Sequence, residues 1–172
     1  MQDLPPHATN DNAYLDTISE RLSRHFDVHR NITKEGEFFD LYAYHQNNFH
    51  KSFITKSTVY EGFSIYEHMA VRLTQTLSEE ALQDFQNMLI TLTPSFANPN
   101  KMHKKSVITG IIICQSPLFP GIKKYTEKFS YRRNYKFCFH GWSETYCAVV
   151  SPADKTIYVS KGNKDLKKFL SF

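Results

Sequence analysis

The sequence lacks any long hydrophobic run. Its longest uncharged apolar stretch, Val107 to Cys114, has eight residues, whereas a membrane-spanning helix needs about 20. No apolar signal core follows Met1 either, although a secretory signal would require one. We therefore expect a protein that does not enter a membrane and that stays in the cytoplasm.

Cysteines and known catalytic motifs are also scarce. Cys114, Cys138 and Cys147 form no C-x-x-C pair and cannot all be bridged, which favours free thiols in a reducing compartment. The chain has no G-x-x-x-x-G-K-[ST], G-x-G-x-x-G, G-x-S-x-G or H-E-x-x-H. These absences exclude the common phosphate-binding loops, the hydrolase nucleophile elbow and zinc sites of familiar spacing. The sequence predicts no metal site and no cofactor.

Aromatic residues, in contrast, are abundant. Fourteen Phe, ten Tyr and one Trp make up 15% of the 172 residues, and aromatic side chains favour the half-buried surfaces of sheets. A chain of this length suits one domain. We therefore expect a single α+β domain over residues 1–172, with residues 1–12 frayed and a largely antiparallel or mixed sheet flanked by helices.

Hydrophobic periodicity predicts the order α-β4-α-β-α-β3-α. Residues 14–26 form the first helix, and a capping box at Thr76–Glu79 begins the second, which Pro94 and Pro99 end. Turns are predicted at Gln46-Asn47-Asn48 and at Glu61-Gly62. Val107 to Cys114 is apolar at every position except Thr109 and is predicted to be a central strand covered on both faces. The other predicted strands cover residues 28–33, 39–44, 49–60, 63–73, 135–139, 145–150 and 156–160, and the other predicted helices cover 122–129 and 165–170.

Charge is divided unevenly along the chain. Residues 1–100 carry 7 Lys and Arg with 13 Asp and Glu, whereas residues 101–172 carry 14 with 4. A basic half of net +10 is typical of proteins with an anionic partner. Two alternatives remain open: the halves attract one another within one fold, or copies of the chain associate head to tail as a homo-oligomer.

The basic half holds a segment in which cations and aromatic residues alternate. Nine Lys and Arg and a single acid lie between Lys101 and Lys136, and such a pattern is typical of single-stranded nucleic-acid binding. The aromatic candidates for stacking are Tyr125, Phe129, Tyr131 and Tyr135, although the helical spacing of Tyr125 and Phe129 also fits a core. The predicted nucleic-acid-binding residues are Lys101, Lys104, Lys105, Lys123, Lys124, Arg132 and Arg133.

A helix followed by strands that carry an acid and then a lysine resembles the restriction-endonuclease-like, or PD-(D/E)xK, superfamily. The resemblance covers about residues 14–114 and implies a nuclease whose carboxylates hold Mg²⁺ beside the scissile phosphate. Asp40 would be the strand aspartate and Lys56 the lysine that steadies the attacking water. Glu20 would be the extra acid that some members carry on the first helix.

The motif is incomplete in this chain. Ile54 stands where the second acid belongs, and Phe39 rather than proline precedes Asp40. Glu61 or Glu67 would have to replace the missing ligand, because Mg²⁺ requires several oxygen ligands. Asp40, Lys56 and Glu67 are therefore the catalytic residues of this alternative only.

Two further patterns carry less chemistry. Tyr60 to His68, together with Phe137 to Trp142, resembles segments of small uncharacterised bacterial domains, and no activity comes with that resemblance. His45 and His50 flank a predicted turn, and His68 lies nearby on the next predicted strand. The three would form a transition-metal site if they met, although isolated histidines are the simpler explanation.

These observations favour a non-catalytic binding or accessory module. We expect its basic C-terminal half to contact nucleic acid or an acidic protein. The alternative is the divalent-metal-dependent nuclease, which is the only reading that calls for Mg²⁺.

Overall fold

The computed structural model describes residues 11–51 and 61–172. Four helices and a 3-10 turn lie in these ranges: α1 (Asp11–Leu22), α2 (Glu79–Ala97), α3 (Pro120–Lys128), η1 (Lys136–Cys138) and α4 (Lys164–Phe169). The strands are β1 (Asp27–Lys34), β2 (Glu37–Lys51), β3 (Glu61–Thr74), β4 (His103–Cys114), β5 (Tyr131–Asn134), β6 (Trp142–Ser151) and β7 (Thr156–Val159).

The strands form one mixed sheet in the order β1-β2-β3-β4-β6-β5, and β7 pairs with a second part of β6. Antiparallel pairing joins β1, β2 and β3, whereas β3, β4 and β6 run parallel. The predicted α+β class and mixed sheet are thus confirmed. Because β3, β4 and β6 share one direction, their amino-terminal ends lie together at one end of the sheet, here called the amino-terminal end.

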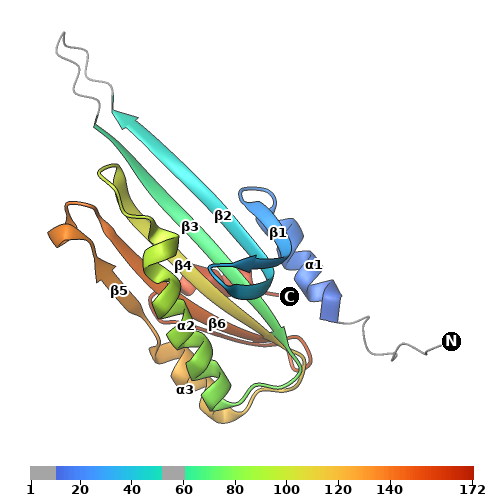
Figure 1. The fold of residues 1–172 in the computed structure, drawn as a ribbon. Coiled ribbons are helices and arrows are strands. Elements are labelled where there is room, and N and C mark those ends of the chain that lie inside the picture. Colours follow the sequence, from blue (N-terminus) through green and yellow to red (C-terminus); the bar gives the residue numbers. More distant parts are fainter. Residues whose placement is uncertain (1–10, 52–60) are drawn as a thin grey trace, which may run out of the picture.

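Strand β4 is central, as its apolar sequence predicts, and helices cover both of its faces (Figure 1). Ile111 and Ile113 belong to a buried cluster that includes residues of α1 and α4. On the other face Ile112 packs in a cluster with residues of α2 and α3. Each fully buried aliphatic side chain of this kind contributes roughly 1.5–3 kcal/mol to folding.

Helix α2 begins and ends differently from the sequence prediction. Its N-cap is Ser78, whose hydroxyl accepts a hydrogen bond from the amide of Ala81 at 3.1 Å, so the prediction that Thr76 caps the helix was wrong. Pro94 lies inside the helix instead of ending it. Phe96 and Ala97 are buried beyond it, and we attribute the continuation of the helix to the burial of these two side chains.

The second half of β2 also corrects the prediction. The expected turn at Gln46-Asn47-Asn48 is part of a continuous strand that pairs with residues 61–71 of β3, and Glu61-Gly62 lies in β3 as well. Three strands precede α2 among the described residues. Of the four predicted there, the strand over residues 49–60 begins in β2, and the rest of it lies outside the described residues. Polar side chains sustain this pairing, since Ser64 Oγ donates to Asn48 Oδ1 at 2.7 Å.

Over the described ranges, every helix is too short or too polar to cross a membrane.

Candidate functional site

The seven predicted nucleic-acid-binding residues fall into two groups in the structure. Lys101, Lys104 and Lys105 lie at or just before the start of β4, and Arg132 and Arg133 lie on β5. Lys123 and Lys124 lie in the first half of α3, which follows the opposite, carboxyl-terminal end of β4 (Figure 1). The first group gathers at the amino-terminal end of the sheet, whereas the second does not.

We call the first group, together with Lys136, the basic edge. The sheet register brings it together, because Lys105 is opposite Trp142 on β6, and Trp142 is opposite Asn134 on β5. Strand β5 is the last strand of its side of the sheet. Its two arginines are therefore exposed at an edge, one toward each face.

A single carboxylate organises part of the basic edge. Glu144 accepts hydrogen bonds from the indole of Trp142 at 3.2 Å and the hydroxyl of Tyr146 at 3.0 Å. It also pairs with Lys105 at 2.7 Å and Arg132 at 3.5 Å. Burial acts to raise the pKa of Glu144, but the hydrogen bonds from Lys105, Tyr146 and Trp142 outweigh it and hold that pKa below its usual value.

Three of the cations lie on aromatic rings, of which Arg133, 6.0 Å from the ring centre of Tyr135, is the most distant. Lys104 Nζ is 4.0 Å from the ring centre of Phe63, and the guanidinium of Arg132 is 5.1 Å from that of Trp142. Such contacts hold a cation in place while leaving its charge available to an anion.

The turn after β5 completes this end of the molecule. The predicted strand over residues 135–139 was wrong: Tyr135 is buried, but Phe137 is 96% exposed and Phe139 is 82% exposed. Lys136, Phe137 and Cys138 have φ values of 44°, 52° and 71°, in the left-handed region that residues other than glycine seldom adopt.

Hydrogen bonds close this turn on itself, and a contact of His140 ties it to the sheet. The amides of Tyr135, Phe139 and Gly141 donate to the carbonyl groups of Gly141, Lys136 and Cys138 at 2.9–3.0 Å. The carbonyl of His140 bonds to Nδ1 of the buried His103 at 2.5 Å, and the other nitrogen of His103 lies 2.9 Å from Ser106 Oγ. The turn is thus tied to the start of β4.

Of the four aromatic residues expected to stack on bases, Tyr131 lies half-buried on β5 beside Arg132, whereas the other three pack into the protein. Tyr125 and Phe129 pack against the buried cluster under α2 and α3, which confirms the alternative that they belong to the core. Tyr135 is buried and its hydroxyl is 2.9 Å from Ser143 Oγ. The exposed rings, Phe137 and Phe139, were missed because alternating aromatic residues are typical of a strand. Gly141 was the available sign of a turn there.

The residues of the nuclease alternative are not brought together. Asp40 Oδ2 accepts the amide of Leu73 at 2.8 Å, and Glu67 lies six residues before Leu73 on β3. At about 3.3 Å per residue, the two carboxylates are roughly 20 Å apart. Lys56 lies outside the described residues.

His45 and His68 do not lie together, as a metal site shared by the three histidines would require. His45 contacts the ring of Phe26, which packs with the cluster of α1 and α4. His68 stacks on Phe96 of α2 and so lies on the opposite face of the sheet, and the side chain of His50 lies outside the described part. No group of three or more His, Cys, Asp or Glu in that part could hold a metal ion.

His68 borders a hollow of about 310 Å³ between β1, β2, β3 and the end of α2. Its Nδ1 is 2.7 Å from the hydroxyl of Tyr42, and its buried Nε2 has no hydrogen-bond partner of acceptable geometry. Burial, assisted by the positive charge of Lys34, lowers the pKa of His68 to about 3. The ring is neutral at physiological pH.

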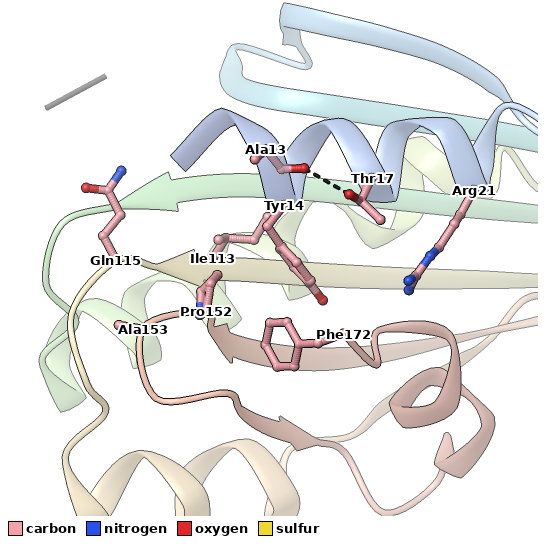
Figure 2. Close-up of a pocket in the computed structure, with 9 residues that line it drawn as sticks. All are labelled: Ala13, Tyr14, Thr17, Arg21, Ile113, Gln115, Pro152, Ala153 and Phe172. Atoms are coloured by element: carbon pink, nitrogen blue, oxygen red, sulfur yellow. Dashed lines mark hydrogen bonds between the residues drawn. The ribbon is translucent and has the colours of Figure 1, made fainter. Parts of the chain in front are cut away.

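A second hollow, of about 530 Å³, lies between α1 and the C-terminal residues (Figure 2). Its polar groups mainly form hydrogen bonds that join α1 to the C-terminal residues. Arg21 donates to the carbonyl groups of Phe169 and Ser171 at 2.7 and 2.6 Å, and the hydroxyl of Tyr14 donates to the backbone carbonyl of Leu170 at 2.6 Å. These bonds explain the hollow as part of the packing of α4 against α1.

Every ion pair between described side chains joins residues of the same half of the chain. Asp16 pairs with Arg30, Glu37 with Arg72, and Glu144 with Lys105 and Arg132. Direct pairing between the acidic and basic halves is therefore absent from the described part. This observation disfavours the alternative in which the halves neutralise each other.

Comparison with known proteins gives one match. No curated protein and no solved structure matches the chain. A family model described as a domain of unknown function (DUF8052) matches residues 10–172. The chain therefore belongs to this family, DUF8052.

Proposed function

We propose that the protein is a binding module that contacts nucleic acid through the basic edge. The observation that carries the proposal is the gathering of six cations at one end of the sheet, with a single carboxylate, Glu144, paired to two of them. Cations held in this way would replace the counterions of a phosphate backbone. Nucleic acid is the polyanion that such a surface suits best.

The first prediction concerns the removal of two cations from the basic edge. We expect Lys104→Ala/Arg133→Ala to weaken binding of a labelled oligothymidylate and to flatten the dependence of log Kd on log salt by about 1.4, because each lost phosphate contact removes about 0.7 on a single strand. Fluorescence anisotropy across a salt series measures both quantities.

The matched control removes the same charge from α3. Lys123→Ala/Lys124→Ala changes the net charge equally but lies outside the basic edge, so we expect its salt dependence to match that of the unaltered protein. Equal losses in the two double variants would mean that net charge alone, and not this edge, attracts the probe. No binding at low salt would reject nucleic acid and leave an acidic protein or a second copy of the chain as the partner.

The metal-dependent nuclease stays a prediction that no contact among the described residues favours. Incubation of the same probe with Mg²⁺ or Mn²⁺ tests it directly, since it requires loss of full-length probe that Asp40→Ala abolishes.

A further inference from the structure

The proposed nucleic-acid binding leaves one feature unexplained, which is the exposure of two phenylalanines on a single turn. Burial of each ring would stabilise the fold by roughly 1.5–3 kcal/mol, yet Phe137 and Phe139 are 96% and 82% exposed. Single exposed apolar residues are common on protein surfaces. Two large rings exposed within three residues are not explained by that tendency.

The backbone of the turn keeps these rings exposed. Three consecutive left-handed residues, none of them glycine, precede Phe139, and each is disfavoured by roughly 1–2 kcal/mol. Such a conformation persists only where its surroundings determine it. Here the bonds within residues 135–141 and the contact of His140 with His103 do so, so the rings are held in position before any partner binds.

The positive charge around the turn indicates which kind of partner the exposed rings would bind. Lys136 lies within it, Arg133 precedes it with its guanidinium 6.0 Å from the ring centre of Tyr135, and Gly141 packs against the backbone of Lys104. Exposed flat rings beside cations are the two elements that bind single-stranded nucleic acid: bases stack on the rings and phosphates contact the cations. A duplex offers only its phosphates, because its bases are already stacked and paired.

We propose that the turn of residues 136–140 is the base-stacking part of the basic edge, a proposal that rests on the proposed function. Phe137 and Phe139 then make the protein select single-stranded over double-stranded nucleic acid. The cations then supply affinity for any phosphate backbone, and the two rings supply the preference for unpaired bases.

The test compares Phe137→Ala/Phe139→Ala with the unaltered protein on a labelled oligothymidylate and on a duplex of the same length. Stacking contributes roughly 1–3 kcal/mol per base, so we expect single-strand binding to weaken about 30-fold or more while duplex binding and the salt dependence stay the same. The variant should fold normally because both rings are exposed, and its urea unfolding curve checks this.

Two further variants sharpen the comparison. Phe119→Ala removes a ring that is 64% exposed at the start of α3, and we expect it to leave binding unchanged. Phe137→Leu/Phe139→Leu keeps the apolar surface but removes the flat rings. We expect it to lose single-strand binding as the alanine variant does, because leucine does not stack on bases.

Each contrary result has a distinct meaning. If the unaltered protein binds both probes with a steep salt dependence and the alanine variant binds them equally well, the stacking role is overturned while the proposed function stands. If neither probe binds at low salt, the proposed function itself fails. If vesicles containing phosphatidylserine bind and the oligothymidylate does not, a membrane surface is the partner and both proposals are overturned.

Discussion

Lowering the pH from 6.5 to 5 is expected to reduce the free energy of unfolding by about 2 kcal/mol through His68 alone. Its ring is buried, stacked on Phe96 and bonded to the hydroxyl of Tyr42. The nearby charge of Lys34 opposes a second positive charge there, and burial has the larger effect. The folded protein therefore keeps this ring neutral.

The sign of the effect follows from proton binding in the two states. The pKa of His68 is 6.5 in an unfolded chain but about 3 in the fold, so between these values the unfolded state binds more protons. Stability is then fully present above pH 6.5 and falls with decreasing pH by up to about 1.4 kcal/mol per unit. The carboxyl groups of Glu144 and Asp154 have lowered pKa values and contribute mainly below this window.

Urea unfolding of the unaltered protein and of His68→Gln at a series of pH values measures the effect. Glutamine can still accept a hydrogen bond from Tyr42 and does not titrate, so its stability should fall less steeply by the amount assigned to His68. Burial also lowers the pKa of His103, but that contribution is common to both proteins. Parallel curves would show that the ring of His68 is accessible to protons in the fold.

The elements that the sequence predicted well are those whose pattern is local. Val107 to Cys114 is nearly continuous in apolar residues and became the central strand β4, because such a sequence is stable only when covered on both faces. Hydrophobic periodicity likewise predicted α2, in which Leu82, Phe85 and Leu89 are buried. In both cases the residues that indicate the element are also those that form its core.

The elements that were predicted wrongly depend on partners distant in the chain. Gln46, Asn47 and Asn48 are typical of a turn, yet they lie in β2 because residues of β3 pair with them. Phe137 and Phe139 alternate as in a strand, yet the contacts of Gly141 with β4 turn the chain outward. Gly141 indicates a turn, but the sequence around neither segment shows which distant strand it contacts.

The same limit applies to the candidate site. The number of Lys and Arg residues identified the basic half of the chain. In the folded protein, the seven predicted binding residues lie partly on the basic edge and partly on α3. Lys101 and Lys124 are both lysines of the basic half, but only the fold puts Lys101 at the amino-terminal end of the sheet and Lys124 on α3. Charge composition therefore predicted the chemistry of the surface but not its extent.

Replacement of Gly141 by alanine is expected to destabilise the fold by about 2–5 kcal/mol and to abolish the proposed single-strand preference. Its φ is +70°, and an added Cβ would lie 2.2 Å from the carbonyl oxygen of Lys104 and 2.7 Å from that of His103. Both are backbone atoms of the central strand or of its start, so they cannot move aside as a flexible side chain would. The strain adds to that of the left-handed φ itself.

Gly36→Ala separates the steric clash of an added Cβ from the conformational cost of a positive φ. Gly36 has a similar φ of +83°, but nothing lies within 4 Å of an added Cβ, so only the conformational cost of roughly 1–2 kcal/mol remains. Urea unfolding of the two variants should therefore differ by at least about 1 kcal/mol. Gly141→Ala, measured while folded, should also bind oligothymidylate as weakly as Phe137→Ala/Phe139→Ala does. Equal stability of the two glycine variants would contradict the close contact with β4, and with it the argument that this contact is what holds the two rings toward a partner.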